Sequence, residues 1–402
     1  MLKTKVKNKE KVLVAMSGGV DSSVAAALLK KSGFNVMGVF MKFWMPLEKN
    51  GLLGKWNRCC SPEAEKRARK VAKVLRIPFY VFNFEKEFKK KIVDYFLKAS
   101  KEGLTPNPCV VCNKEIKFGL LLERALRLGV GLVATGHYSC LRPRRLAGRR
   151  QEIKNQRPAS PAGESKIKNY KLLRGKDKKK DQSYFLWQLN QKQLRHILFP
   201  VGGYTKKEVK VLARKFKLSV LNVPESQEIC FVPKTVGDFL AKYLKAKPGP
   251  IVEKVHTGAS KIINRRVLGQ HNGLHFYTIG QRKGIKISGG PWYALGKDVK
   301  NNTLIVTKDE RDLEKNELAT RDVNWISGVP PKLPLKIKAK IRYKSKLTSA
   351  TINPTHRCIS VRRNKKEGGA RLVFKKPQRA ITPGQSVVFY LKNEVLGGGI
   401  IC

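Results

Sequence analysis

Residues 12–23 read VLVAMSGGVDSS, an apolar run followed by two glycines and the start of a helical pattern. The apolar run is typical of a buried strand, and Gly33 stands where a helix beginning near Asp21 would end. Gly18 and Gly19 allow backbone amides to approach an anion closely, and the helix N-terminus behind them adds a favourable dipole. The loop has neither the GKS or GKT of a Walker A sequence nor a GxGxxG fingerprint. The stretch therefore predicts a phosphate-binding turn between a strand and a helix.

Strands and helices alternate through the first half of the chain. Strands are expected at residues 35–44, 78–84 and 130–138, and helices at residues 61–77, 87–103 and 113–129. Ser61 and Pro62 supply a cap and a first-turn proline for the earliest of these helices. The alternation predicts an α/β fold whose parallel sheet is covered by helices on both faces.

The later part of the chain changes character in three places. Residues 142–169 are rich in Arg, Pro, Ser and Gly and lack aromatic residues, which predicts a flexible basic insertion that either contacts RNA or is a solvated loop. The stretch LKIKAKIRYK at 335–344 alternates apolar and basic residues, so one face of a strand would pack and the other would be cationic. The predicted domains are a phosphate-binding domain with the insertion, a small central domain and a C-terminal β-barrel, at residues 1–235, 236–296 and 297–402.

The charge of the chain is its strongest compositional feature. Lys and Arg number 84 against 29 Asp and Glu, for a net charge of +55 in 402 residues. Such an excess favours a nucleic-acid partner, although a solvated lysine-rich surface is the simpler alternative. No run of about 18 apolar residues is present, and the apolar run near the N-terminus is too short for a signal peptide. The sequence therefore predicts a cytoplasmic protein without a membrane span.

Eight cysteines stand at positions 59, 60, 109, 112, 140, 230, 358 and 402. In a cytosolic chain they are not expected to form a disulfide framework. Cys109 and Cys112 lie in TPNPCVVCNKEIKF, residues 105–118. A structural zinc site would need a second CxxC, and a thioredoxin-like dithiol would follow a strand rather than two prolines. His271 and His275 are separated by Asn-Gly, which breaks a helix, so no metal site is predicted there.

Several motifs together resemble one family. SGGVDSS is similar to the PP-loop of ATP pyrophosphatases, and it is followed in order by TPNPCVVCNKEIKF, ATGHY, KDQSYFL, ESQEICF, YTIGQRKG and PGQ. This order resembles that of the tRNA-specific 2-thiouridylases over nearly the whole chain apart from residues 142–169. The resemblance implies a PP-loop α/β domain, a small central domain and a C-terminal β-barrel. It implies that ATP adenylates the C2 oxygen of the wobble uridine of tRNA, and that a cysteine persulfide then supplies sulfur, giving 2-thiouridine, AMP and pyrophosphate.

The resemblance also implies roles for individual residues. Cys112 would be the nucleophile, and Cys230 would carry the persulfide or resolve the intermediate. The residues expected to bind ATP are Ala15, Met16, Ser17, Gly18, Gly19, Val20, Asp21, Ser22, Met41 and Gly136. Those expected to contact the target base are Asn107, Pro108 and Cys109. Those expected to contact tRNA are His137, Lys180, Asp181, Gln182, Arg342, Tyr343 and Gln385. For His137, a hydrogen-bonded histidine of the core is the alternative.

The neighbours of Cys112 agree with a nucleophilic role. Cys112 immediately precedes Asn113, which is expected to cap a helix, and Lys114 and Lys117 follow closely. A helix N-terminus and nearby cations stabilise a thiolate. Cys230 is distant in sequence, so the two thiols could meet only through folding, and a buried apolar thiol is its alternative.

Cys109 departs from the family pattern, because many members carry Asp at this position. A thiol cannot fully replace a carboxylate in acid–base chemistry, and it adds a third cysteine to Cys112 and Cys230, the number that holds an iron–sulfur cluster in related thiolation enzymes. The expected cofactors are therefore ATP and Mg²⁺, with an iron–sulfur cluster as the alternative. The expected partners are tRNA and a protein that donates persulfide sulfur, and the chain is expected to be a monomer. Two rival functions stay open, a PP-loop synthetase acting on a small molecule and a non-catalytic RNA-binding protein.

Overall fold

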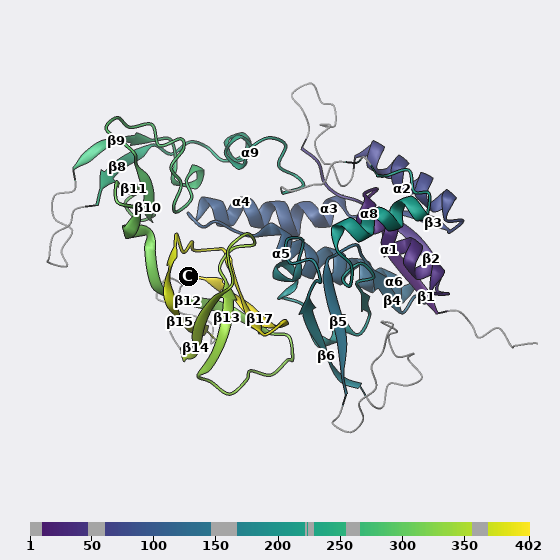
Figure 1. Cartoon of the computed structure of the whole chain (residues 1–402). Coiled ribbons are helices and arrows are strands. Elements are labelled where there is room, and N and C mark those ends of the chain that lie inside the picture. Colours follow the sequence, from purple (N-terminus) through teal and green to yellow (C-terminus); the bar gives the residue numbers. More distant parts are fainter. Residues whose placement is uncertain are drawn as a thin grey trace, which may run out of the picture.

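The computed structural model describes residues 10–46, 61–145, 167–221, 223, 229–254, 266–355 and 369–402. Most of the predicted insertion at 142–169 lies outside these residues, as do Cys59, Cys60 and Cys358. Three units follow one another along the chain: a parallel-sheet unit, a central unit and a barrel (Figure 1). Among the described helices, none is long and apolar enough to cross a membrane.

The parallel-sheet unit contains five strands in the order β3-β2-β1-β4-β7. Their bounds are Lys11–Ala15 for β1, Asn35–Lys42 for β2, Phe79–Asn83 for β3, Leu132–Ala134 for β4 and Ile197–Leu198 for β7. The pairs within this sheet are parallel. Helices α1, α2 and α8 of this unit span Val20–Lys31, Pro62–Val74 and Lys206–Lys215. The predicted α/β fold is therefore confirmed, and its order reverses between β1 and β4, where ligands of open α/β sheets bind.

Two long helical segments follow one another between β3 and β4. The first runs through α3 (Glu85–Phe88), η1 (Lys89–Val93) and α4 (Asp94–Lys101), and the second through α5 (Pro108–Cys112), η2 (Asn113–Leu120) and α6 (Leu121–Arg127). The second was expected to begin at Asn113, and this expectation was wrong. Pro108 occupies the first helical position instead, where its fixed φ suits a helix start and its missing N–H costs nothing.

The central unit is built around a four-stranded sheet in the order β10-β11-β8-β9. Its elements are α9 (Val236–Tyr243), β8 (Gly249–Glu253), β9 (Val267–His271), η5 (Leu274–Phe276), β10 (Tyr293–Asp298) and β11 (Thr303–Thr307). The predicted boundary between residues 296 and 297 falls inside β10, which pairs with β11. The sheet therefore continues about ten residues beyond that boundary, a long-range pairing that composition does not reveal.

The C-terminal unit is a closed barrel of six antiparallel strands. Its strands are β12 (Glu314–Trp325), β13 (Leu335–Lys340), β14 (Thr348–Thr355), β15 (Gly369–Arg379), β16 (Ser386–Leu391) and β17 (Glu394–Ile401), and pairing of β12 with β17 closes it. Along β13, Ile337 and Ala339 are buried while Lys336 and Lys338 are exposed, as the alternation predicted. Lys340 departs from it, because it is buried and its Nζ donates to the carbonyl oxygen of Tyr343 (3.1 Å). The β5–β6 hairpin, Ser139–Arg145 and Ile167–Arg174, pairs with β17 and so joins the parallel-sheet unit to the barrel.

One hydrophobic cluster is shared by the parallel-sheet unit and the barrel. It contains Val110 and Phe118 from the second helical segment and Val388 and Tyr390 from β16, all buried. Trp187, which follows η4 (Ser183–Leu186), is fully buried among them. Because removing water from apolar surface is the main driving force for association, this shared core fixes the barrel against the helix that carries Cys112.

The neighbouring glycines 202 and 203 provide a test of this packing. A Cβ at Gly202 would lie 1.7 Å from the carbonyl oxygen of Ser139 at the start of β5, whereas a Cβ at Gly203 would meet nothing within 4 Å. Gly202→Ala should therefore lower the free energy of unfolding by at least about 1–3 kcal/mol, the usual cost of overpacking. Gly203→Ala should leave it nearly unchanged. Equal midpoints in chemical denaturation for the two variants would contradict the packing described.

Candidate active site

The phosphate-binding turn predicted at residues 16–20 lies at the carboxyl end of β1. Gly18 has φ +72°, and a Cβ there would lie 2.3 Å from the carbonyl oxygen of Ala64, so only glycine fits. Gly19 is the N-cap of the 12-residue helix α1 and, as a glycine, brings no side chain of its own to cap the first turn. The hydroxyls of Ser22 and Ser23 instead donate to the carbonyl oxygen of Gly19 (3.2 and 2.8 Å). The first amides of α1 are thereby left for an anion, as in other helix-terminal phosphate sites.

Gly136 closes the site from the next strand. It follows β4 and abuts the first turn of α1, because a Cβ there would lie 2.6 Å from the amide nitrogen of Ser22. Ala15, Met16 and Met41 also lie at the carboxyl ends of β1 and β2, next to the strand-order reversal. The structure thus brings the residues predicted to bind ATP to one edge of the sheet.

Asp21 is the centre of a small polar cluster beside this turn. Its Oδ1 accepts hydrogen bonds from the hydroxyl of Tyr138 (2.7 Å) and from Nζ of Lys206 (2.7 Å). The side chain of Lys206 is only 12% exposed, so its ammonium is held next to the anion-binding turn in a partly desolvated position. Neither Tyr138 nor Lys206 was predicted from the sequence. A sequence signal existed for Lys206: Thr205 and Glu208 form a capping box, which places Lys206 at the first position of α8.

Cys109 and Cys112 lie in the first turns of the helix that begins at Pro108. Cys112 is 7% exposed and belongs to the main core of the parallel-sheet unit, whereas Cys109 is partly exposed. Asn113 does not cap the helix as predicted; it lies inside it, and its Nδ2 donates to the carbonyl oxygen of Phe185 (3.1 Å). The helix dipole therefore acts most strongly at Cys109, one turn before Cys112.

The structure brings Cys230 to the same core as Cys112. Cys230 packs against the cluster that contains Cys112, and its neighbour Phe231 packs edge-on to Phe96 (centroids 5.5 Å apart). Residues 224–228, which precede Cys230, lie outside the described residues. Within the described part of the chain, no three His, Cys, Asp or Glu side chains are grouped closely enough to hold a metal ion. The three-cysteine set suggested for an iron–sulfur cluster is therefore not assembled in this conformation.

Two of the residues predicted to contact tRNA, Asp181 and Gln182, form hydrogen bonds within the parallel-sheet unit. Asp181 is buried, where it pairs with Arg174 (2.7 Å) and accepts from the amides of Gly175 and Ser183 (3.1 Å each). Gln182 accepts from the amide of Tyr138 (2.9 Å). The geometry of these two residues is that of a buried hydrogen-bond network. Lys180 lies in a partly exposed turn whose amides bind Asp177 and so remains accessible.

His137 has the geometry of a hydrogen-bonded core histidine. It is 8% exposed, bonds Thr135 Oγ1 through Nδ1 (2.7 Å), and lies between the rings of Phe118 and Phe199. Burial, with a further contribution from Lys117, lowers the pKa of His137 well below its ordinary value. A neutral histidine of the core fits this environment, and contact of His137 with tRNA remains a prediction.

Arg342 and Tyr343 connect the barrel to the other two units. Nη2 of Arg342 donates to the carbonyl oxygens of Ile279 in the central unit (3.1 Å) and Ala380 in the barrel (3.0 Å). Burial lowers the pKa of the Arg342 guanidinium. The ring of Tyr343 packs against Phe185 (centroids 4.6 Å apart). These contacts hold the barrel in a fixed orientation, and tRNA contact by the same residues remains a prediction.

Gln385 contacts the loop that precedes the cysteine helix. Its Nε2 donates to the carbonyl oxygen of Thr105 (2.8 Å), two residues before Asn107. The hydroxyl of Tyr184 donates to the carbonyl oxygen of Ser386 in the barrel (2.8 Å), and burial raises the pKa of Tyr184, with Asn107 acting in the opposite direction. Asn107, Pro108 and Cys109, the residues predicted to contact the target base, therefore follow directly on a loop that the barrel holds.

Comparisons with known proteins cover all three units. Residues 10–234 match a family model described as the tRNA methyl transferase HUP domain, residues 237–308 its PRC-barrel domain, and residues 315–401 an aminomethyltransferase beta-barrel domain. The chain is 44% identical over 392 residues to "tRNA-specific 2-thiouridylase MnmA 2" of Thermoanaerobacter sp. (strain X514), covering 97% of each protein. It is 44% identical over 398 residues to "tRNA-specific 2-thiouridylase MnmA" of Moorella thermoacetica, covering 97% of this chain and 98% of the relative. Since the matches extend over nearly the full length of both proteins, the chain belongs to the family of tRNA-specific 2-thiouridylases.

Proposed function

We propose that the protein is an ATP-dependent tRNA uridine 2-sulfurtransferase that thiolates the wobble uridine. The observation that carries the proposal is the joining of two sites in one unit: an uncapped helix N-terminus at the strand-order reversal, and a cysteine helix in the same core. Full-length similarity to relatives named tRNA-specific 2-thiouridylases supports it. A small-molecule synthetase would not need the barrel that contacts the cysteine loop.

The turn at residues 17–19 would bind the phosphates of ATP. The free amides of α1 and the ammonium of Lys206 supply positive potential for the pyrophosphate part of ATP. The partly exposed Asp21 is the carboxylate that would face a magnesium ion, which would neutralise phosphate charge during the transfer. Met41, at the carboxyl end of β2, would contact adenine through its backbone, and Gly136 would let the nucleotide lie close to α1.

The proposed chemistry has two stages. The C2 oxygen of the uridine attacks the α-phosphorus of ATP, pyrophosphate leaves, and the base becomes an adenylate whose leaving group is AMP. The terminal sulfur of a cysteine persulfide then attacks C2 and AMP departs. Attack of the second cysteine on the inner sulfur breaks the S–S bond, releases 2-thiouridine and leaves a Cys112–Cys230 disulfide that must be reduced before the next cycle. Cys112 would be the nucleophile, and Cys230 would carry the persulfide or resolve the intermediate.

The remaining partners follow from the same chemistry. The target uridine must be extruded from the anticodon stack to reach Cys112, and Asn107, Pro108 and Cys109 would contact it. Lys180 and the cationic face of β13, with Lys336 and Lys338, would contact phosphates. A persulfide-carrying protein would supply sulfur to a monomeric, cytoplasmic enzyme.

Mass spectrometry of tRNA nucleosides tests the proposed function directly. The purified protein would be incubated with an unmodified tRNA transcript, ATP, Mg²⁺ and a persulfide donor. We expect 2-thiouridine at position 34 with release of AMP and pyrophosphate. A matched transcript with cytidine at position 34 is the control and should give no thiolated nucleoside. Unchanged uridine in the first transcript would refute the proposal.

Replacing Cys112, Cys230 or both by Ser should remove nearly all thiolation activity. Cys112→Ser and Cys230→Ser should each reduce thiolation at least about 1,000-fold, since each removes an essential group from one chemical unit. Because effects within such a unit are not additive, the double variant should be no slower than the slower single variant. Cys140→Ser, at a partly buried position on β5, is the control and should retain activity. Multiple-turnover thiolation by either single variant would exclude the two-cysteine mechanism.

Lys206 and Lys207 form a matched pair of adjacent lysines on α8. Lys206 Nζ binds Asp21 beside the phosphate turn, whereas Lys207 is exposed. Lys206→Met should raise the KM for ATP about tenfold, the effect of losing one charge-assisted contact, and leave the Kd for tRNA nearly unchanged. Lys207→Met should alter neither constant. A similar KM for ATP in both variants would show that Lys206 does not contribute to the nucleotide site.

Cys109 distinguishes persulfide chemistry from the iron–sulfur alternative. If Cys109 only neighbours the uridine, Cys109→Asp restores the residue common in the family, and activity should persist or rise without iron. If Cys109 holds a cluster, protein purified without oxygen should contain iron and acid-labile sulfide, and Cys109→Asp should lose both together with activity. We expect the first result. Stoichiometric iron whose removal abolishes thiolation would show that the persulfide account is wrong.

A further inference from the structure

The loop at residues 103–107 connects α4 to the helix that carries Cys109 and Cys112, and hydrogen bonds from two other units hold it. On the barrel side, the amide of Thr105 donates to the carbonyl oxygen of Pro383 (2.9 Å). Nε2 of Gln385 donates back to the carbonyl oxygen of Thr105 (2.8 Å). Thr105 is therefore bound through both of its backbone polar groups, the arrangement that fixes a loop residue most firmly.

Gly384 allows the backbone of the barrel to lie this close to the loop. Its φ is +90°, and a Cβ would lie 2.9 Å from both Cβ of Leu104 and the amide nitrogen of Thr105. Any larger residue would push the two backbones apart. The contact is thus specified by the sequence TPGQ at residues 382–385 and is not an incidental approach of two surfaces.

The central unit holds the beginning of the same loop. Lys297 on β10 donates from Nζ to the carbonyl oxygen of Gly103 (3.0 Å), and Val299 packs against Gly103, whose φ is +77°. Burial lowers the pKa of Lys297 to about 8. Removing the ammonium of Lys297 from water costs free energy, which a hydrogen bond must offset. The bond to the carbonyl oxygen of Gly103 therefore links the position of the loop to that of Lys297.

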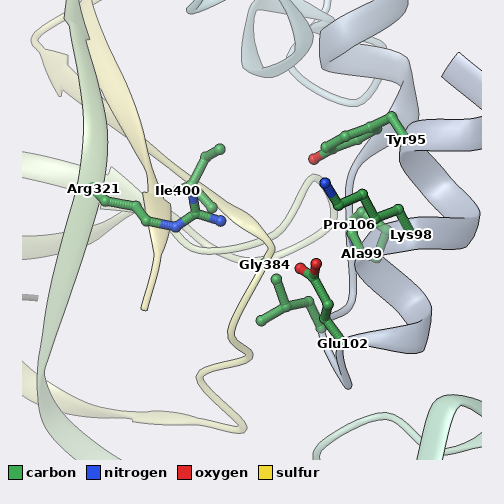
Figure 2. A pocket seen from close by; sticks show the side chains of 9 residues that line it. Tyr95, Lys98, Ala99, Glu102, Pro106, Arg321, Gly384 and Ile400 are labelled. Atoms are coloured by element: carbon green, nitrogen blue, oxygen red, sulfur yellow. The ribbon is translucent and has the colours of Figure 1, made fainter. Parts of the chain in front are cut away.

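The two units that hold the loop are themselves joined. Arg342 bridges Ile279 of the central unit and Ala380 of the barrel, beside the TPGQ turn. Behind the loop lies a pocket of about 190 Å³. Figure 2 shows its walls, with Arg321 and Ile400 on the barrel side facing Tyr95 and Lys98 on α4. The pocket leaves space on this side of Leu104 and Pro106, so the hydrogen bonds of Gly103 and Thr105 help to fix the loop there.

We propose that Gln385 and Lys297 are positioning residues, which place the 103–107 loop and thereby align the start of the cysteine helix with the base of a tRNA held by the barrel and the central unit. The inference rests on the proposed function. It predicts that the two units that bind tRNA also determine where Cys112 lies relative to the bound base. A displacement of about 1 Å between two reacting groups is enough to slow a reaction about 100-fold.

The test uses Gln385→Met and Lys297→Met, which remove the donor atoms at nearly constant size. Lys300→Met removes the same charge from an exposed turn of the central unit and is the matched control. In single-turnover reactions with saturating ATP and persulfide, each positioning variant should thiolate at least about tenfold more slowly. For Lys297→Met, the Kd for tRNA should change by less than about twofold, which is less than the loss of one phosphate contact. Lys297→Arg keeps a donor and should recover most of the rate.

A second measurement needs neither tRNA nor ATP. Cys112 is 7% exposed, so its modification by iodoacetamide, followed by peptide mass spectrometry, should be slow in the full-length protein. Both positioning variants should react faster at Cys112, and Lys300→Met should not. Unchanged alkylation together with an unchanged thiolation rate would overturn the inference, as would a loss of tRNA affinity in Lys297→Met equal to its loss of rate. Absence of thiolation in the unaltered protein would refute the proposed function, while faster alkylation in the variants would still support the positioning role.

Discussion

The pair of hydrogen bonds between Thr105 and the TPGQ turn is the contact on which the arrangement of the site depends. It joins residues about 280 positions apart in the chain and binds the barrel to the loop that precedes Cys109 and Cys112. The shared core around Trp187 fixes the same two units by burial, which is strong but not directional. Hydrogen bonds add the direction, so the helix start is both close to the barrel and oriented by it.

Charged and polar groups surround the phosphate turn, the second part of the candidate site. The chain carries 84 basic and 29 acidic residues, so anionic substrates are attracted from a distance. At close range, the proposed phosphate site offers specific groups: the N-terminal amides of α1, and Lys206 paired with Asp21. Asp21 also accepts a hydrogen bond from the hydroxyl of Tyr138, so two donors orient its carboxylate beside the turn. The general positive charge therefore favours encounter, and the local geometry provides selectivity for phosphate.

The parts of this structure that could be predicted are those encoded by neighbouring residues. The phosphate turn follows from two glycines between an apolar strand and a helix, and β13 follows from simple alternation. The start of the cysteine helix was misplaced because Pro108 was interpreted only as a stiff loop residue, although proline is also favoured at the first helical position. The burial of Asp181 and His137, and the partners of Lys206, Lys297 and Gln385, depend on contacts between distant segments, which a single sequence does not reveal. For that reason Asp181 and His137, which were expected at the RNA surface, were found buried within the parallel-sheet unit.

Hydrogen–deuterium exchange at the amide of Thr105 tests the central claim most directly, because that amide donates the bond to Pro383. The amide would be followed in the unaltered protein and in Gly384→Ala, whose added methyl group would lie 2.9 Å from the loop. The account predicts slow exchange in the unaltered protein and fast exchange in the variant, with the amides of β1 protected equally in both. Fast exchange of Thr105 in the unaltered protein would contradict it, since the barrel would then not hold the loop that leads into the cysteine helix.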